Sequence, residues 1–270
     1  MKKTRPVRTE AEALVAVQKD GKALEHVPEE LKTPAVCEAA VRQDVNAFPF
    51  VPEDLKTPKL CAEAVRMNGC ALMDVPEELR TKELCRAALA QTGWVLQFVP
   101  ERLKTPAMCL EAVKDSGRAL RAVPEAWRTE EMCFAAVRND GWALDAVPDR
   151  HMSEEMCLAA VCTTGEALEY VPDEFLSPSL CLAAVRQDWE ALVWVPTEMK
   201  TQEACMAGIE QDAEAISMVP DDVMTEEMCL SALKRCGGWL CAVPKRLKTP
   251  AICSLAVQQD GFILPVITVG

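Results

Sequence analysis

The sequence predicts an all-α protein, an α-solenoid of about ten repeats of 24 residues each. The pair Val-Pro recurs at this interval from Val27 to Val243 with no insertion or deletion. Every copy places threonine or serine six residues after the valine, and cysteine ten residues after it. A fixed period in this range indicates helical units that stack on one another and bury one continuous core.

The first element of each repeat is expected to be a helix of about ten residues. With the valine counted as position 1, the threonine or serine at position 7 would accept hydrogen bonds from the free N–H groups of the helix start. Position 8 is proline in five copies and position 9 is glutamate in five, and both suit a first turn. Positions 10, 11, 14 and 15 form the apolar stripe, as in Met132, Cys133, Ala136 and Val137.

The second element is expected to be a short helix, followed by a single turn of α or 3₁₀ type. Position 19 is usually glycine, which would fit a left-handed end of the first helix. Positions 21, 22 and 1 of the next copy form a second apolar stripe about two turns long. The proline at position 2 should end it, because the residue before proline is forced out of the α region.

Several copies depart from this pattern, the first of them with Val45 in place of the glycine of position 19. Trp189 and Ala213 replace the glycine of position 19, so we expect the turn to differ there. Trp239 replaces the alanine of position 21 and follows Gly238. This copy is a candidate for a local bulge, since tryptophan does not fit an alanine site without strain.

The chain is expected to divide into a basic tail, a capping repeat, the solenoid and a short C-terminal tail. Residues 1–8 are basic, and residues 9–26 are a degenerate leading copy in which Thr9 is the cap and Ala13 replaces cysteine. The ten regular copies cover residues 27–266, and residues 267–270 are the C-terminal tail. The last copy is too apolar for a capping repeat. Its end would fold back over the core, continue into a longer protein, or meet a second copy end to end.

Composition excludes several classes of function. The net charge of −13 argues against binding nucleic acid or an anionic membrane, because both need clustered lysine and arginine. No apolar run is long enough to cross a membrane. The N-terminal basic residues are not followed by the apolar stretch of a signal peptide.

Ten of the fourteen cysteines occupy position 11. Stacked helices lie about 9–10 Å apart, whereas a disulfide needs Cα atoms about 4.4–6.8 Å apart. We therefore interpret these cysteines as small buried hydrophobic residues, which predicts a reducing compartment, the cytoplasm.

The consensus V-P-x-x-L-K-T-x-x-x-C-x-x-A-V-x-x-D-G-x-A-L resembles the repeat family known as domain of unknown function 4116. The Val-Pro, Ala-Val and Gly-x-Ala-Leu segments carry the resemblance over residues 9–266. That family has no established activity or catalytic residues, and its occurrence in proteins of protists and intracellular bacteria implies interaction modules. The repeat length is also similar to that of leucine-rich variant repeats, a likeness of architecture alone.

Catalytic or metal chemistry has few candidate residues. The two histidines, His26 and His151, lie in different repeats, and a Cys–His pair must be within hydrogen-bond reach to act. Two cysteine pairs, Cys157 with Cys162 and Cys236 with Cys241, have a loose zinc-ligand spacing but supply two ligands each. We therefore expect no enzyme activity and no cofactor, with a thiol- or zinc-dependent redox protein as the alternative.

Charged residues recur at three positions of the repeat. Position 3 is mostly acidic, whereas positions 6 and 16 are mostly basic. We expect these lines of charge to be exposed and to form ion pairs between neighbouring repeats, with little effect on stability.

Aromatic residues at positions 19, 20 and 24 are the candidates for binding a partner. They belong to the short-helix layer, where they should be partly exposed, and aromatic residues are enriched at interface centres. The first hypothesis is a non-enzymatic scaffold that binds a protein or peptide along an extended surface, and the third is a nucleic-acid-binding solenoid, which the acidic charge disfavours. The candidate residues are Trp94, Phe98, Trp142, Tyr170, Trp189 and Trp194.

Overall fold

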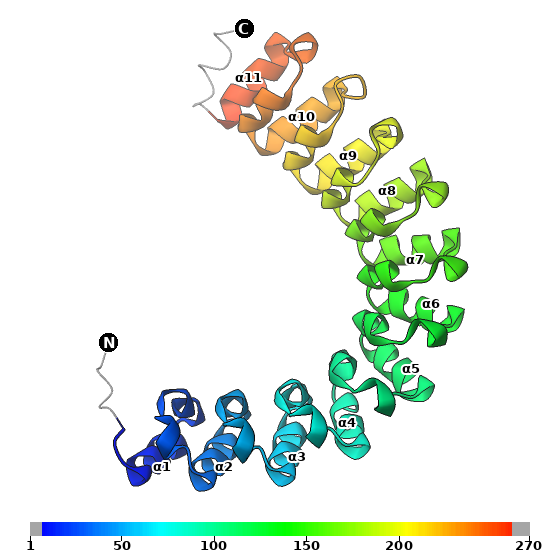
Figure 1. Cartoon of the computed structure of the whole chain (residues 1–270). Coiled ribbons are helices and arrows are strands. Elements are labelled where there is room, and N and C mark those ends of the chain that lie inside the picture. The colour runs from blue at the N-terminus through cyan, green and yellow to red at the C-terminus, as the bar shows by residue number, and fades with distance from the viewer. Residues whose placement is uncertain (1–6, 261–270) are drawn as a thin grey trace. The chain divides into compact units, whose positions relative to one another are not determined.

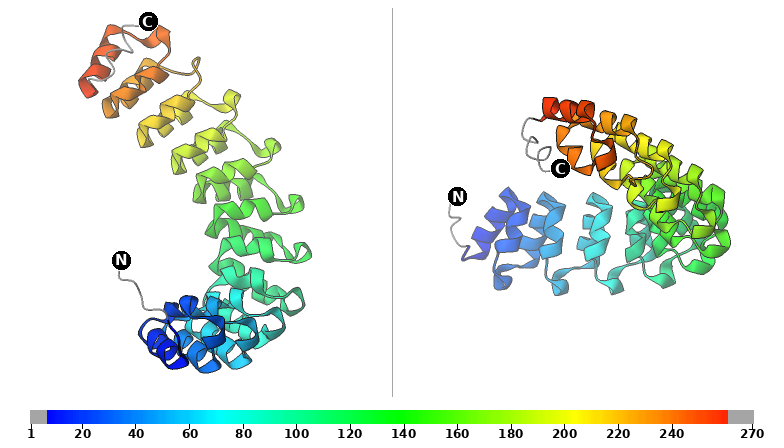
Figure 2. Two further views of the ribbon diagram at one scale, coloured as in Figure 1. Left: turned by 60° about the vertical axis from the view of Figure 1, so that its left-hand side comes forward. Right: turned by 90° about the horizontal axis from the view of Figure 1, so that it is seen from above.

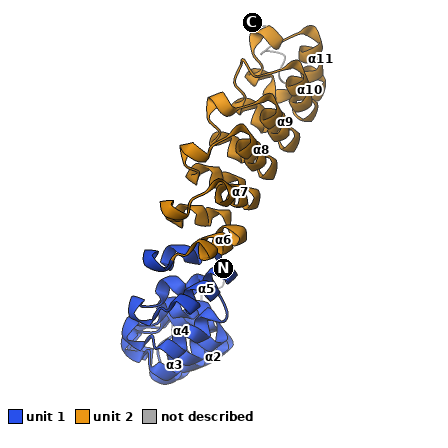
Figure 3. Ribbon diagram, turned by 90° about the vertical axis from the view of Figure 1, so that its right-hand side faces the viewer, with its two compact units in different colours: residues 1–127 blue, residues 128–270 orange. Residues whose placement is uncertain are grey.

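The computed structural model describes residues 7–260. The chain divides into two compact units, one ending at Trp127 and the other beginning at Arg128 (Figure 3). Each unit is a row of repeats in which consecutive α-helices lie side by side in chain order (Figure 1). All regular secondary structure within residues 7–260 is helical, so the prediction of an all-α repeat protein is confirmed.

The long helix of each repeat has ten residues, except α4, which has eight. It begins directly after position 7 and ends before position 18, as expected. Unit 1 contains α1 (Glu10–Lys19), α2 (Pro34–Gln43), α3 (Pro58–Met67), α4 (Lys82–Leu89) and α5 (Pro106–Asp115). Unit 2 contains α6 (Glu130–Asn139), α7 (Glu154–Thr163), α8 (Pro178–Gln187), α9 (Gln202–Gln211), α10 (Glu226–Arg235) and α11 (Pro250–Gln259).

The second element is a 3₁₀-helix that spans positions 19 to 24. In unit 1 these are η1 (Gly21–His26), η3 (Val45–Phe50), η5 (Gly69–Asp74), η7 (Gly93–Phe98) and η9 (Gly117–Ala122). In unit 2 they are η11 (Gly141–Ala146), η13 (Gly165–Tyr170), η15 (Trp189–Val193), η17 (Ala213–Met218) and η18 (Gly237–Ala242). Within each unit they pack beside one another as a second layer, the 3₁₀ layer (Figure 2).

A three-residue 3₁₀-helix follows the proline in most repeats, as the predicted single turn. In unit 1 these helices are η2 (Glu29–Leu31), η4 (Glu53–Leu55), η6 (Glu77–Leu79), η8 (Glu101–Leu103) and η10 (Glu125–Trp127). In unit 2 they are η12 (Asp149–His151), η14 (Asp173–Phe175), η16 (Thr197–Met199) and η19 (Lys245–Leu247). After Pro220 the chain forms a turn instead.

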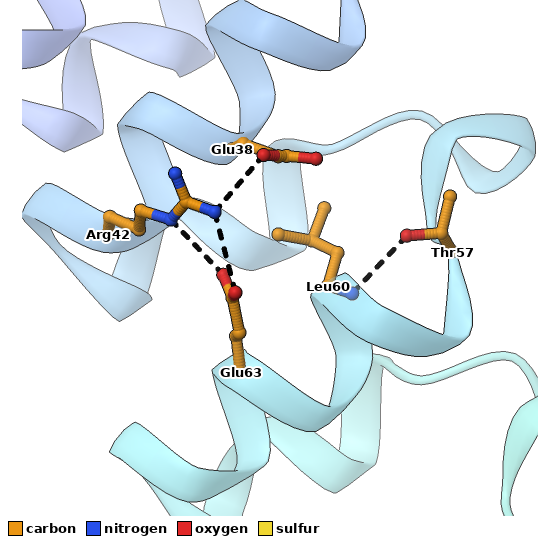
Figure 4. A network of polar contacts seen from close by, with 5 residues as sticks. All are labelled: Glu38, Arg42, Thr57, Leu60 and Glu63. Carbon is orange, nitrogen blue, oxygen red and sulfur yellow. Dashed lines mark hydrogen bonds and ion pairs between the residues drawn. The ribbon is translucent and has the colours of Figure 1, made fainter.

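Short polar side chains cap the start of the long helix and the start of the 3₁₀-helix that follows it. The predicted cap at position 7 is confirmed, as where the Leu60 N–H donates to the Thr57 hydroxyl at 3.2 Å (Figure 4). A second cap lies at position 18, where Asp44 accepts a hydrogen bond from the N–H of Asn46 at 2.9 Å. This bond lowers the pKa of the Asp44 carboxyl. The second cap was not predicted, although aspartate or asparagine stands at position 18 in most copies.

The core consists of the two apolar stripes that the sequence predicts. Positions 10, 11, 14 and 15 are buried in most long helices, and positions 21, 22 and 1 are buried beside them. For the repeat that begins at Val123 these residues are Met132, Cys133, Ala136, Val137, Ala143 and Leu144, with Val147 from the start of the next repeat. Alanine at position 14 keeps the surface of the long helix flat, so the 3₁₀-helix of the preceding repeat can approach its backbone.

The glycine at position 19 has a different role from the one predicted. No glycine between residues 7 and 260 has a positive φ, so the expected left-handed helix end is wrong. The glycine is needed because the next repeat lies against it: a Cβ on Gly93 would stand 2.1 Å from the carbonyl oxygen of Ala112. The Gly93 N–H also donates to Asp115 of that repeat at 2.6 Å. Position 19 is therefore a contact between the backbones of neighbouring repeats.

The adjacent glycines of η18 offer a matched test of this contact. A Cβ on Gly237 would lie 2.2 Å from the carbonyl oxygen of Ala256, whereas a Cβ on Gly238 would meet its nearest neighbour, the sulfur of Cys236, at 3.6 Å. We expect Gly237→Ala to lower the free energy of unfolding by about 1–3 kcal/mol, because backbone cannot yield as a side chain does. Gly238→Ala should be neutral or slightly stabilising. Urea denaturation measures both, and equal losses would show that the close approach is not the cause.

The expected departures at Ala213 and Trp239 are not found. η17 begins at Ala213 and keeps six residues, as η3 does with Val45 at the same position. η18 also has six residues, and Trp239 is half-buried within it without a bulge. At Trp189 the 3₁₀-helix does change: η15 is one residue shorter and Trp194 becomes its C-cap.

The basic residue at position 6 is not an exposed charge, as the sequence suggested, but a buried contact within its own repeat. Lys32, Lys56 and Lys104 are buried, with Lys104 7% exposed. The Lys104 ammonium donates to the Glu101 carboxylate and to the carbonyl oxygen of Ala122, at 2.6 Å each. A buried ammonium needs such partners, since desolvation otherwise disfavours its charge. We call a basic residue at position 6 that donates to the position-24 carbonyl a closing cation; the others are Arg80, Arg128 and Lys200.

Position 16 does join neighbouring repeats through ion pairs, as expected. The Arg42 guanidinium of α2 lies 3.3 Å from Glu63 of α3 and 3.2 Å from Glu38 of its own helix (Figure 4). The hydrogen bond to Arg42 lowers the pKa of the Glu63 carboxyl. In unit 2, Arg186 lies 2.8 Å from Glu203. These pairs are exposed, so their effect on stability is small.

Some expectations concern residues outside the described range. The basic tail lies largely in residues 1–6, and the end of the last copy, the C-terminal tail and the proposed end-to-end contact lie in residues 261–270. None of the helices described between residues 7 and 260 is both long enough and apolar enough to cross a membrane.

Candidate partner-binding surface

The six candidate aromatic residues all lie in the 3₁₀ layer, in two separate groups. Trp94 and Phe98 belong to η7 of unit 1, and their rings meet edge to face with centroids 5.3 Å apart. Trp94 is 39% exposed, whereas Phe98 is half-buried. An edge-to-face pair fixes both rings at the surface without burying them in the core.

The second group belongs to unit 2. Trp142 of η11 and Tyr170 of η13 come from consecutive repeats, and their rings meet edge to face at 5.9 Å. Trp194, next to η15, is 41% exposed beside the exposed Val193. Trp189 is half-buried at the start of η15, and its backbone N–H donates to the Gln211 side chain of the next repeat at 3.1 Å. The pairing across repeats was not predicted, because the two residues are far apart in the sequence.

The charge of the 3₁₀ layer differs between the two units. In unit 1 the layer carries Lys22, Arg118 and Arg121 together with Glu25 and Asp74. In unit 2 the helices η11, η13, η15 and η17 contain no lysine or arginine. Their acidic residues are Asp145, Glu166, Glu169, Glu190 and Glu214. A uniform scaffold therefore presents two chemically different faces.

A shallow hollow of about 480 Å³ lies in the 3₁₀ layer of unit 1. Trp94 and Gln97 of η7 line one side, and Arg118 and Arg121 of η9 line the other. The closing cation Lys104 contributes to its wall. An aromatic ring next to basic groups suits a polar ligand better than an apolar one.

The cysteines of position 11 lie in the core, as expected, apart from Cys253, which is half-buried. Burial raises the pKa of the thiols that lie in the core, to about 11 for Cys37, Cys133 and Cys157. Nucleophilic and metal-binding cysteines act as thiolates, which burial disfavours here. All fourteen cysteines lie in the described part of the chain, and all are free thiols.

Thiol titration can check this arrangement directly. We expect Cys162, Cys236 and Cys241, which are exposed, to react rapidly with a disulfide reagent at neutral pH, and the buried position-11 thiols to react only in denaturant. Replacing the three exposed cysteines by serine should remove the rapid phase. Rapid reaction of any buried thiol would instead support a redox role.

No site for a metal is evident between residues 7 and 260. No group of three or more histidine, cysteine, aspartate or glutamate side chains is placed there to hold one ion. Cys236 and Cys241 are both exposed, and the Cys241 thiol lies 3.4 Å from the carbonyl oxygen of Gly238. His26 is exposed, and His151 ends a 3₁₀-helix in the other unit.

The architecture is that of a helical repeat protein in which α- and 3₁₀-helices alternate. The model of the family described as Domain of unknown function (DUF4116) matches residues 13–56, 59–104 and 153–200, just over half of the chain. The chain belongs to this family, as its repeat pattern suggested. No curated protein and no solved structure matches it.

Proposed function

We propose that the chain is a non-enzymatic scaffold that binds a protein or peptide partner along the 3₁₀ layers of its units. The observation that carries the proposal is that aromatic side chains stay exposed or half-buried at positions that vary while the framework stays constant. Position 20 is Trp94, Arg118, Trp142 and Glu166 in four successive repeats, although the cysteine, cap and core positions hardly change. Variable residues on a rigid framework are the usual arrangement of a binding surface.

The thiols support a reducing location, the cytoplasm, for this scaffold. A chain with fourteen free cysteines would be exposed to mispairing in an oxidising compartment. The raised pKa of the buried thiols supports a structural role over a redox role. The acidic net charge supports a protein or peptide partner over nucleic acid.

A selection from a random peptide library displayed on phage tests the proposal and does not require the partner to be identified. We expect the chain to enrich peptides, and Trp94→Ala, Trp142→Ala and Trp194→Ala together to weaken their binding at least roughly tenfold, because interface aromatics carry much of the binding energy. Leu158→Ala is the control, since Leu158 is also exposed but lies on the long helix α7.

The melting curves of these variants decide how the result is read. Truncation of exposed side chains should leave the melting temperature nearly unchanged. A large loss of stability would show that the rings are part of the core. Absence of enriched peptides, or equal binding by the aromatic variant and the wild type, would contradict the scaffold function.

A further inference from the structure

We propose that the 3₁₀ layer of unit 2 binds an extended partner segment that carries lysine or arginine at every third residue. The proposal rests on the proposed scaffold function and names the chemistry of one partner. Its centre is an acidic ladder, defined as Glu166, Glu190 and Glu214. These residues occupy position 20 in three successive repeats, the second residue of η13, η15 and η17.

The acidic ladder lacks counterions. In the described part of unit 2, neither its three carboxylates nor that of Glu169 forms an ion pair or accepts a hydrogen bond. Partial desolvation, followed by the charges of Asp188, Glu190 and Glu169, raises the pKa of Glu166. Carboxylates that repel one another are stabilised by a cationic partner, which removes the repulsion.

Two repeats at this face also lack the positive charge of the closing cation. The closing cation is replaced by Met152 and Leu176 in the two repeats that contain η13 and η15. The repeat that follows them keeps it: the Lys200 ammonium lies 3.1 Å from the carbonyl oxygen of Met218 at the end of η17. The potential above η13 and η15 is therefore more negative than it would be over a repeat with the usual lysine.

Aromatic and apolar side chains complete the docking surface. Trp142 and Tyr170 form their edge-to-face pair at one end, and Trp194 and Val193 are exposed at the next repeat, 41% and 57% respectively. An arginine or lysine binds such a surface in two ways: its aliphatic stem covers apolar area, and its charge interacts with an aromatic face. An acidic partner would be repelled by the carboxylates, and a purely apolar partner would contact the aromatic and apolar side chains alone.

The spacing of the acidic ladder sets the spacing of the partner's charges. Neighbouring repeats are separated by about 8–10 Å, the distance between packed helices. An extended or polyproline II segment advances about 3.1–3.4 Å per residue, so one repeat corresponds to about three residues. A polyproline II helix also has three residues per turn, so basic side chains at every third residue all face the same side.

Fluorescence anisotropy of the full-length chain with two labelled peptides tests both the charge and the spacing. The first peptide has four successive Arg-Pro-Ala triplets, and the second has the same composition with its arginines adjacent. We expect the spaced peptide to bind at least roughly tenfold more tightly, and its affinity to fall as salt is raised, because the contacts are between charges.

Matched variants assign the binding to the acidic ladder. Glu166→Gln, Glu190→Gln and Glu214→Gln together should weaken the spaced peptide roughly tenfold or more. Glu155→Gln, Glu210→Gln and Glu227→Gln together remove the same charge from exposed sites on the long helices and should change binding less than about twofold. Equal effects of the two triple variants, or equal binding of the two peptides, would overturn the proposal.

The chain's own N-terminal segment is a competing occupant, because Lys2, Arg5 and Arg8 recur at the same spacing. The triple variant Lys2→Ala, Arg5→Ala and Arg8→Ala of the full-length chain tests this alternative. If only this variant binds the spaced peptide, the N-terminal segment is the occupant of the face, and the proposal of a separate partner is overturned. Unchanged binding supports the proposal.

The phage selection separates failure of this proposal from failure of the scaffold function. Enriched peptides that depend on the aromatic residues but lack spaced basic residues would leave the scaffold function standing and overturn the partner chemistry. If no peptide is enriched and the spaced peptide does not bind, both proposals fail.

Discussion

Raising the pH from about 9 to about 11 is expected to lower the free energy of unfolding steadily, because the buried thiols resist ionisation. Burial raises the pKa of Cys37, Cys133 and Cys157 to about 11 from the ordinary value of 9.0. Between these values the unfolded chain releases protons that the folded chain retains, so alkaline pH favours unfolding. The stabilisation is fully present below about pH 9 and is lost as pH rises toward 11. Each such thiol contributes up to about 1.4 kcal/mol per pH unit to this fall in the free energy of unfolding.

Urea denaturation at a series of pH values, with a reductant present, measures this slope. The free energy of unfolding of the double variant Cys133→Ala and Cys157→Ala should fall less steeply with pH than that of the wild type. The difference in slope should correspond to the release of up to about two fewer protons on unfolding. Cys162→Ser is the control, because Cys162 is exposed and should leave the slope unchanged. An unchanged slope in the double variant would show that groups other than these two thiols cause the alkaline sensitivity.

Phe48→Ala is expected to lower the free energy of unfolding by about 3–5 kcal/mol, the largest loss from any single truncation considered for unit 1. Phe48 is fully buried in η3, where it occupies position 22. The ammonium of Lys56 lies 5.3 Å from its ring centroid, so the ring also faces a closing cation. Removal of the ring would leave a cavity and a less well compensated buried charge.

Phe48→Leu is the matched control, since leucine occupies position 22 in most repeats and is fully buried there, as at Leu72 and Leu96. It should cost about 1 kcal/mol. Both variants can be compared by urea denaturation with a signal from unit 1. A similar loss in the two variants would show that the aromatic ring, and not the filled volume, supports the fold at this position.

The bounds of the long helices could be predicted from the sequence because their causes are local. Thr129 caps α6 through an N–H only three residues away, and the apolar stripe of Met132 to Val137 repeats within two turns. Each of these signals lies within one helix. The same reasoning correctly identified the buried cysteines, since position 11 belongs to that stripe.

The errors arose where a residue's partner lies in another element. Gly93 is glycine because of the Ala112 carbonyl in the next repeat, and nothing within its own turn indicates this. Lys104 resembles a surface lysine until Ala122, eighteen residues later, is placed beside it. The aromatic residues were predicted to be exposed, but the contact between Trp142 and Tyr170 depends on how two repeats stack. The sequence pattern of a repeat describes its own helices better than its contacts with the next repeat.

The missing closing cations also bear on how firmly the short helices are held. Amide protons of η13 and η15 should exchange with solvent faster than those of η9, where Lys104 ties the last carbonyl to the preceding turn. The repeats with Met152 and Leu176 would then open locally at a lower free energy than their neighbours. Such local looseness would let the rings of Tyr170 and Trp194 adjust to ligands of somewhat different shape, while the cysteine-lined helices behind them stay rigid.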